Sequence, residues 1–227
     1  MNGSTVRTTE MPLLLIGIHK DELEFGDRVA LSLGDQVDVL RVEKGLNGAN
    51  PTPDGLFHYS IRHAEMYHQV LQRVARKEGP VIDLHTGINR TARCADVYCH
   101  SERFLRCLEQ EIASGRHGHM ARSEDVRLVQ IVSHMTARGR PRPEVSAGAR
   151  PIVWTYIPEM VWRNPRFLYV GIEVFLPVPG AGSVEDQQFA GELVRLAADC
   201  AGQVARKDCS LRTRKGGLAA DWPPTRG

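Results

Sequence analysis

Residues 12–22, with the sequence Pro-Leu-Leu-Leu-Ile-Gly-Ile-His-Lys-Asp-Glu, change from an unbroken apolar run to a polar cluster within a few positions. A short run without alternating polar residues is typical of a strand that is covered on both faces in a parallel or mixed sheet. His19 follows this strand directly, and Glu22 comes three residues later. Both side chains can therefore turn toward one point, where the strand gives way to a helix.

The alternation of buried strands and helices continues along the chain. Residues 81–84 form a second apolar run that again ends on a histidine, His85, and residues 168–177 form a third in which Glu173 is the one charged residue. Strands that alternate with helices indicate an α/β layered domain. Apolar periodicity and turn residues predict a further strand at 37–42 and helices at 22–33, 60–76, 102–113, 125–135 and 183–205.

Composition limits the classes of function. The 227 residues are 42% hydrophobic, which suits a globular chain, and 29 basic against 27 acidic side chains give a net charge of +2. So small a charge predicts no nucleic-acid partner. The apolar run at 11–18 is too short to cross a bilayer and lacks the cluster of basic residues and the small-residue cleavage site of a secretory signal, so we expect no membrane partner. The five cysteines form no CxxC pair, which argues against a disulfide framework and favours a reducing, cytoplasmic location.

His19, Glu22 and His85 are the strongest candidates for a metal site. Open α/β sheets bind ligands beyond the carboxyl ends of their strands, so the three side chains can converge there. Two imidazoles and one carboxylate form a known catalytic zinc set that leaves a coordination position open. Taken alone, however, His-x-x-Glu occurs often by chance, and a histidine at a helix start with a solvated acid is the alternative.

Four short segments follow one another along the chain: His19-Lys-Asp-Glu22, Tyr59-Ser-Ile-Arg-His-Ala-Glu65, Asp83-Leu-His-Thr86 and Gly171-Ile-Glu-Val174. Taken in this order, they resemble the succinylglutamate desuccinylase/aspartoacylase family of zinc-dependent amide hydrolases, which is related to the zinc carboxypeptidases. The resemblance covers most of residues 12 to 200. It implies a mixed, largely parallel sheet flanked by helices, and one Zn²⁺ per chain bound by His19, Glu22 and His85. It also implies that Glu173 is the general base that takes a proton from the attacking water.

The residues themselves also single out Glu173 and Asp83. A carboxylate inside an apolar strand is costly to bury unless it is paired or protonated, which fits a general base. The alternatives for Glu173 are an outward-facing side chain or an ion pair with an arginine such as Arg166. Asp83, two positions before His85, is either an acceptor that orients a metal-binding imidazole or an ordinary acid at a strand end.

The resemblance also suggests substrate-binding residues. It places Arg41 where family members polarise the scissile carbonyl, and it places Asn47 in their substrate motif. Gly48 stands where the family has a second arginine, so a bidentate clamp for a substrate carboxylate is absent or supplied elsewhere. Arg163, ten residues before Glu173, is the best replacement, and Arg90 is a weaker one.

Together these features predict a zinc-dependent hydrolase of an amide bond in an N-acyl amino acid or a similar small substrate. A carboxypeptidase-like or cell-wall amidase activity and a catalytically silent zinc- or ligand-binding protein are the alternatives. We expect a catalytic domain at residues 1–205 and a basic, loosely ordered tail at 206–227, without the C-terminal β-rich domain of larger relatives. Whether copies of the chain associate stays open.

Overall fold

The computed structural model describes residues 11–47, 55–115, 121–133, 150–153 and 155–216. Within these residues one mixed sheet has seven strands in the order β2-β1-β3-β7-β4-β5-β6. Neighbouring strands are parallel except for β4 and β7, which are antiparallel. The predicted mixed, largely parallel α/β sheet is therefore confirmed. The strands are β1 (Leu13–Ile16), β2 (Asp38–Arg41), β3 (Val81–Ile88), β4 (Cys94–Cys99), β5 (Val126–Ile131), β6 (Ile152–Val153) and β7 (Tyr169–Leu176).

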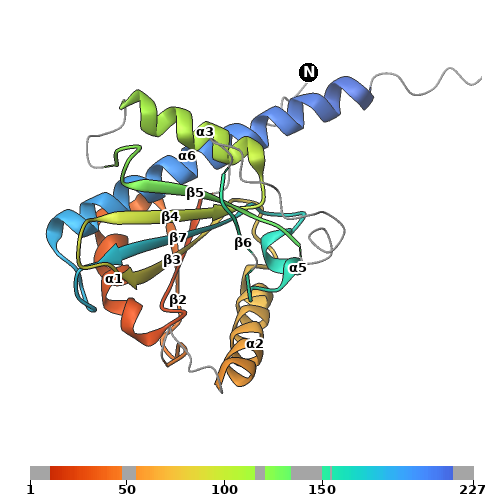
Figure 1. Cartoon of the computed structure of the whole chain (residues 1–227). Coiled ribbons are helices and arrows are strands. Elements are labelled where there is room, and N and C mark those ends of the chain that lie inside the picture. Colours follow the sequence, from red (N-terminus) through yellow and green to blue (C-terminus); the bar gives the residue numbers. More distant parts are fainter. Residues whose placement is uncertain (1–10, 48–54, 116–120, 134–149, 154, 217–227) are drawn as a thin grey trace, which may run out of the picture.

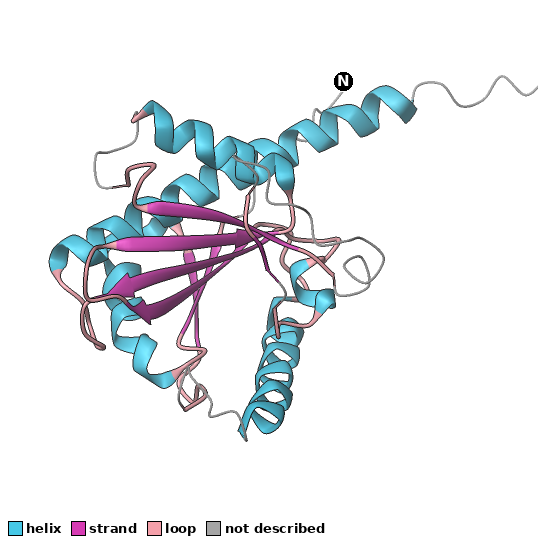
Figure 2. Cartoon of the chain, in the orientation of Figure 1, coloured by secondary structure: helices cyan, strands magenta, loops and turns pink. Residues whose placement is uncertain are grey.

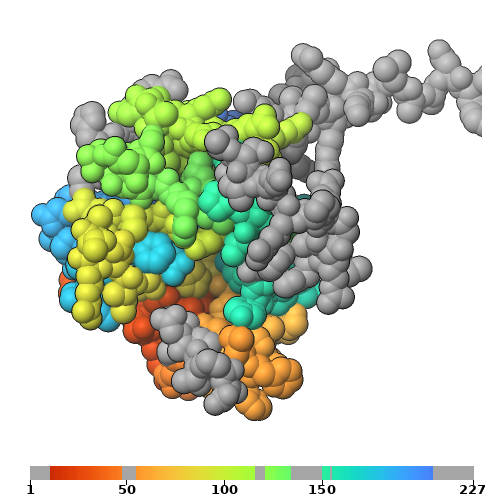
Figure 3. All heavy atoms as spheres, in the orientation of Figure 1, coloured from red at the N-terminus to blue at the C-terminus, as the bar shows by residue number. Residues whose placement is uncertain are grey.

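Helices cover both faces of the sheet (Figures 1 and 2). On one face, α1 (Leu23–Leu33), α3 (Glu102–Ser114) and α6 (Val184–Gly216) contribute to one apolar core. On the other face, α2 (Leu56–Val74) and α5 (Glu159–Trp162) contribute to a second, smaller core. α2 and α5 contact each other, and they lie side by side in the space-filling view (Figure 3).

The alternation of side chains along the strands divides the residues between these two cores. In β1, Leu14 and Ile16 face the core with α1 and α6, whereas Leu13 and Leu15 face the core with α2. In β3, Ile82 and Leu84 likewise belong to the first core. Since successive side chains of a strand point to opposite faces, Asp83 and His85 lie on the α2 face. The same rule places Glu173 on that face, because its neighbours Ile172 and Val174 belong to the first core.

The segment at 125–135 was wrongly predicted as a helix. The structure has β5 there, which pairs in parallel with β4 on one side and with β6 on the other. Its β-branched residues Val126, Val129 and Ile131 are buried, and a short apolar run of this kind does not by itself distinguish a helix from a strand. β4 was not predicted, because Asp96 interrupts its apolar residues.

The last helix is longer than expected. α6 continues to Gly216, so the predicted domain boundary at residue 205 falls inside a helix, and residues 217–227 lie outside the described part of the chain. Among the described residues, no helix combines the length and the apolar character needed to cross a membrane.

A disulfide between Cys107 of α3 and Cys200 of α6 joins two helices of the larger core. The two cysteines are 93 residues apart in the sequence. The expectation that the cysteines form no disulfide framework, which also favoured a reducing location, is contradicted by this bond. It rested on the spacing of the cysteines in the sequence, which does not show which of them lie close together in the fold.

Removing the disulfide is expected to destabilise the fold. The bond closes a long loop, so Cys107→Ser should lower the free energy of unfolding by about 2–5 kcal/mol, mainly through the greater freedom of the unfolded chain. Denaturant unfolding of the oxidised protein and of the variant measures this difference. Cys94→Ser, which removes a free thiol, is the control. Equal unfolding curves for the wild type and Cys107→Ser would show that the bond does not contribute.

Candidate metal centre

The chain turns sharply between β1 and the candidate metal ligands. Gly17 has a φ of +82°, and a Cβ atom there would lie 2.7 Å from the carbonyl oxygen of Val42. A residue with a side chain would therefore be strained at this position. His19 follows as the residue before a 3₁₀ turn at Lys20–Glu22, and its backbone N–H lies 3.2 Å from Oε2 of Glu22. Backbone hydrogen bonds to Leu46 on both sides of His19 fix the turn.

His19, Glu22 and His85 meet at one point. The Nδ1 atom of His19 lies 2.8 Å from Oε1 of Glu22, and the Nδ1 atom of His85 lies 3.1 Å from Oε2 of the same carboxylate. One ligand atom from each of the three residues lies within 4.8 Å of the others. The side chain of Glu22 is 2% exposed, so this carboxylate depends on its two imidazole partners. The structure thus brings together the three residues that the sequence suggested. His19 and Glu22 come from the turn after β1, and His85 comes from β3, the parallel neighbour of β1 in the sheet.

The second nitrogen of each imidazole also has a partner. Nε2 of His19 lies 2.9 Å from the hydroxyl of Tyr59. Nε2 of His85 lies 3.1 Å from Oδ2 of Asp83. These contacts leave the two Nδ1 atoms facing the Glu22 carboxylate, which is the arrangement that a shared metal ion needs.

Asp83 is held by two tyrosines that the sequence analysis did not single out. The hydroxyls of Tyr67 and Tyr169 donate to its Oδ2 atom at 2.5 and 2.6 Å, and all three residues are fully buried. Of the two interpretations of Asp83, the structure favours the acceptor that orients His85. Sequence reasoning missed the tyrosines because they occupy apolar positions of α2 and β7, and only the tertiary fold brings their hydroxyls to one carboxylate.

The electrostatics of the cluster favour a cation. Burial acts to raise the pKa of Glu22, but the charge of His85 and hydrogen bonds from His19 and His85 outweigh it and bring the pKa to about 2. Burial acts to lower the pKa of His85, but Asp83 and Glu22 raise it well above its usual value. Positive charge at this point therefore balances two buried carboxylates, those of Glu22 and Asp83. A divalent cation can take over this role, and the nitrogen and oxygen donors fit zinc.

Glu173 faces the same cavity as the three candidate ligands. It pairs in register with His85 across β3 and β7, and paired residues on neighbouring strands point to the same face. The cavity has a volume of about 530 Å³. The alternative ion pair with Arg166 is not formed, because Arg166 is exposed and donates to the carbonyl oxygen of Ala75.

Two of the predicted substrate residues pair elsewhere. Arg41 forms ion pairs with Asp27 at 2.9 Å and with Glu43 at 3.2 Å. Arg163 pairs with Glu159 at 2.6 Å and lies over the ring of Trp162. Neither arginine lines the cavity with the candidate ligands.

The other two predicted substrate residues are also outside this cavity. Arg90 is exposed after β3, and Asn47 is exposed at the end of a described segment. Gly48, where the family arginine is missing, lies outside the described residues. The roles assigned to Arg41, Asn47, Arg90 and Arg163 stay predictions that the geometry does not support.

Aromatic and acidic side chains line the cavity instead. Among its described lining residues there are three acids, Asp21, Glu22 and Glu173, and no lysine or arginine. His63 of α2 also lines it, and its buried Nδ1 has no hydrogen-bond partner among the described residues. Burial, together with the neighbouring His19 and His85, lowers the pKa of His63 to about 4.

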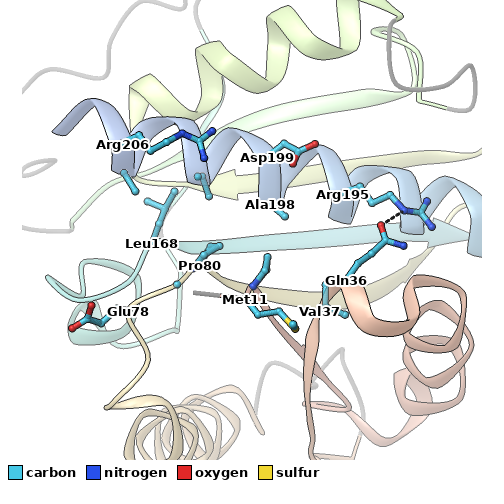
Figure 4. Close-up of a pocket in the computed structure, with 15 residues that line it drawn as sticks. Met11, Gln36, Val37, Glu78, Pro80, Leu168, Arg195, Ala198, Asp199 and Arg206 are labelled. Carbon is cyan, nitrogen blue, oxygen red and sulfur yellow. Dashed lines mark hydrogen bonds between the residues drawn. The ribbon is translucent and has the colours of Figure 1, made fainter. Parts of the chain in front are cut away.

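A second cavity, of about 450 Å³, lies away from the candidate metal ligands (Figure 4). It is lined by residues that precede three strands, Met11, Pro80 and Leu168, and by α6. Parallel strands carry their amino ends at one edge of a sheet, so this cavity lies at the edge opposite the cluster of His19, Glu22 and His85.

Comparison with known proteins gives no family assignment. No family model matches the chain, and no curated protein matches its sequence. Among solved structures, murine aminoacylase 3 is similar over 87% of this chain, with 14% identity and a TM-score of 0.43. The chain spans 65% of the length of that protein.

Two further solved structures that are similar to the chain are amidases or lytic enzymes by description. The N-acetylmuramoyl-L-alanine amidase AmiC2 of Nostoc punctiforme is 10% identical, with 88% of this chain and 98% of the amidase covered and a TM-score of 0.36. The catalytic domain of the CD27L endolysin, which targets Clostridia difficile, is 13% identical, with 85% and 97% covered and a TM-score of 0.35. At this level of similarity the likenesses carry no argument about the chemistry of the chain.

If Asp83 orients His85, its loss should weaken metal binding. We expect Asp83→Asn to lower zinc affinity about 10- to 100-fold, because the amide is a weaker acceptor for the imidazole. Competition with a chromophoric chelator measures the affinity. Asp38→Asn, which breaks a partly exposed ion pair with Lys77, is the control and should leave zinc affinity unchanged. Equal zinc affinity of Asp83→Asn and wild type would exclude the orienting role.

Proposed function

We propose that this protein is a metal-dependent hydrolase of an amide bond in a small N-acyl compound. One observation carries the proposal. His19, Glu22 and His85 gather their ligand atoms at the wall of a cavity, and Glu173 reaches the same cavity from the neighbouring strand. Three metal ligands and a separate carboxylate are the groups that metal-assisted amide hydrolysis needs.

His19, Glu22 and His85 would hold a zinc ion. When bound there, zinc would supply a Lewis acid that polarises the amide carbonyl and makes water more acidic. The contact of His85 with Asp83 and that of His19 with Tyr59 hold both imidazoles in place for this task. Because Glu22 and Asp83 are almost completely buried, little water competes for these contacts.

Glu173 would move the proton. Its carboxylate takes a proton from the attacking water and then donates that proton to the departing amine, so that one group serves both steps. The side chain lies among apolar strand neighbours but is only partly buried, which leaves it open to the cavity. No other acid on β7 can take this role, because Glu173 is the one acidic residue of that strand.

Two classes of substrate are candidates for this site. N-acyl amino acids are the first. Short peptides or cell-wall amides are the second, and one observation favours them: the described lining of the cavity includes Asp21 and Glu173 but no lysine or arginine that could bind a substrate carboxylate. A substrate that is neutral at the recognised end would meet no repulsion there.

A substrate panel with controlled zinc content tests the proposal. The purified protein is assayed on anionic N-acyl amino acids, neutral N-acyl amino acids, short peptides and muropeptides. We expect turnover of at least one class, loss of turnover after chelation, and recovery when zinc is added. A protein that binds zinc stoichiometrically but hydrolyses none of these compounds would be a silent metal-binding protein, and the proposal would be wrong.

Replacing Glu173 separates catalysis from metal binding. We expect Glu173→Gln to lower kcat about 10²- to 10⁴-fold, because the amide cannot accept the proton, while the zinc content stays that of the wild type. Steady-state kinetics and elemental analysis of the same sample measure both quantities. Glu185→Gln, at an exposed position of α6, is the control. Full activity of Glu173→Gln with bound zinc would reject the assigned base.

A further inference from the structure

Glu173 has a neighbour in β4 that the sequence did not suggest. β4 is antiparallel to β7, and in this register Asp96 lies directly opposite Glu173 while Tyr98 lies opposite Gly171. Residues two apart in a strand share a face, so Asp96, Tyr98 and Glu173 are all on the side of the cavity. Gly171 has no side chain, and a Cβ atom there would already lie 3.5 Å from Cβ of Tyr98. The ring of Tyr98 can therefore lie across β7 and reach Glu173.

The hydroxyl of Tyr98 lies between two carboxylates. Its oxygen is 3.0 Å from Oε2 of Glu173 and 2.9 Å from Oδ2 of Asp96. A phenol carries one proton, so it can donate to only one of the two carboxylates at a time. The other partners of Glu173 and of Asp96 decide which of the two carboxylates accepts the hydrogen bond from the Tyr98 hydroxyl.

Arg127 of β5 compensates the charge of Asp96. Its Nε donates to Oδ1 of Asp96 at 2.8 Å, and its Nη2 donates to Oδ2. Asp96 is 4% exposed, so this guanidinium rather than water is the main partner of its carboxylate. Glu173 makes no ion pair among the described residues, so its carboxylate is the stronger acceptor for the Tyr98 proton.

We infer that Tyr98, supported by Asp96 and Arg127, is a positioning residue that holds the Glu173 carboxylate during amide hydrolysis; this rests on the function proposed above. While Glu173 is a carboxylate, the Tyr98 hydroxyl donates to it. Once Glu173 carries the proton from water, its own O–H donates to the Tyr98 oxygen, and the Tyr98 hydroxyl turns to Asp96. No bond to hydrogen breaks in this exchange, and the general base has a partner both before and after it takes the proton.

A double-mutant cycle on kinetics tests this role. We expect Tyr98→Phe to lower kcat about 10- to 100-fold, the usual effect of losing one hydrogen bond to a charged group, while KM changes less than about two-fold. In the Glu173→Gln background the same substitution should change kcat less than about two-fold, because the carboxylate that it positions is gone. Zinc content should be unchanged in all variants.

A matched pair of arginine variants separates positioning from general loss of a surface charge. Arg127 and Arg122 are both largely exposed, and both pair with an aspartate, but only Arg127 is linked to Tyr98. Arg127→Gln should lower kcat, whereas Arg122→Gln should not. Because Arg127 is at the surface, its variant also tests the inference if Tyr98→Phe does not fold. Additive effects of Tyr98→Phe and Glu173→Gln, or full activity of Arg127→Gln, would overturn the inference.

The contact can also be measured without turnover. In urea unfolding of the zinc-free protein, the shifts in midpoint caused by Tyr98→Phe and Glu173→Ala should be non-additive in the double variant, because alanine leaves no acceptor for the Tyr98 hydroxyl. If the wild type hydrolyses no substrate of the panel, the proposed function is contradicted. The unfolding cycle then still tests whether the Tyr98 hydroxyl and the Glu173 carboxylate interact. Additive midpoint shifts would then show that hydroxyl and carboxylate do not interact.

Discussion

The carboxylate of Glu22, buried between the Nδ1 atoms of two histidines, is the interaction on which the rest of the site depends. Taking a charged carboxylate out of water is costly unless its partners compensate it, and here His19, in the turn after β1, and His85, in β3, do so. The arrangement requires β1 and β3 to be neighbours in register, and it requires the tight turn at Gly17. A fold that places three such groups together has either a proton or a metal ion to balance their charge.

The two faces of the sheet carry different kinds of side chain. The face covered by α1, α3 and α6 is filled with apolar side chains and carries the larger core. The other face carries Asp83, His85, Asp96, Tyr98 and Glu173 on three adjacent strands, next to the smaller core under α2 and α5. Because these polar residues belong to paired strands, their relative positions are fixed by backbone hydrogen bonds rather than by a flexible loop. The parallel pair β3–β7 sets Glu173 beside His85, and the antiparallel pair β7–β4 sets Tyr98 beside Glu173.

Much of the fold follows from local pattern, and less of the site does. The apolar runs at 13–16, 81–84 and 169–176 and the helices around 23–33 and 102–114 are strong periodic signals, and the structure has them. The segment at 126–131 was misassigned because buried β-branched residues fit either a strand or a helix. The arginines could not be placed from sequence, since whether Arg41 faces a substrate or Asp27 depends on tertiary contacts. Other tertiary contacts could not be predicted for the same reason. They are the hydrogen bonds of the Tyr67 and Tyr169 hydroxyls to Asp83, the hydrogen bond of the Tyr98 hydroxyl to Glu173, and the disulfide of Cys107.

Anomalous diffraction at the zinc absorption edge, on crystals grown with zinc, is the most direct test of the metal centre. One peak is expected about 2.0–2.1 Å from the Nδ1 atoms of both His19 and His85, the usual distance for zinc and imidazole nitrogen, with an oxygen of Glu22 as the third ligand. A peak at another place, or none at these three residues under saturating zinc, would contradict the metal centre and the hydrolysis proposed from it.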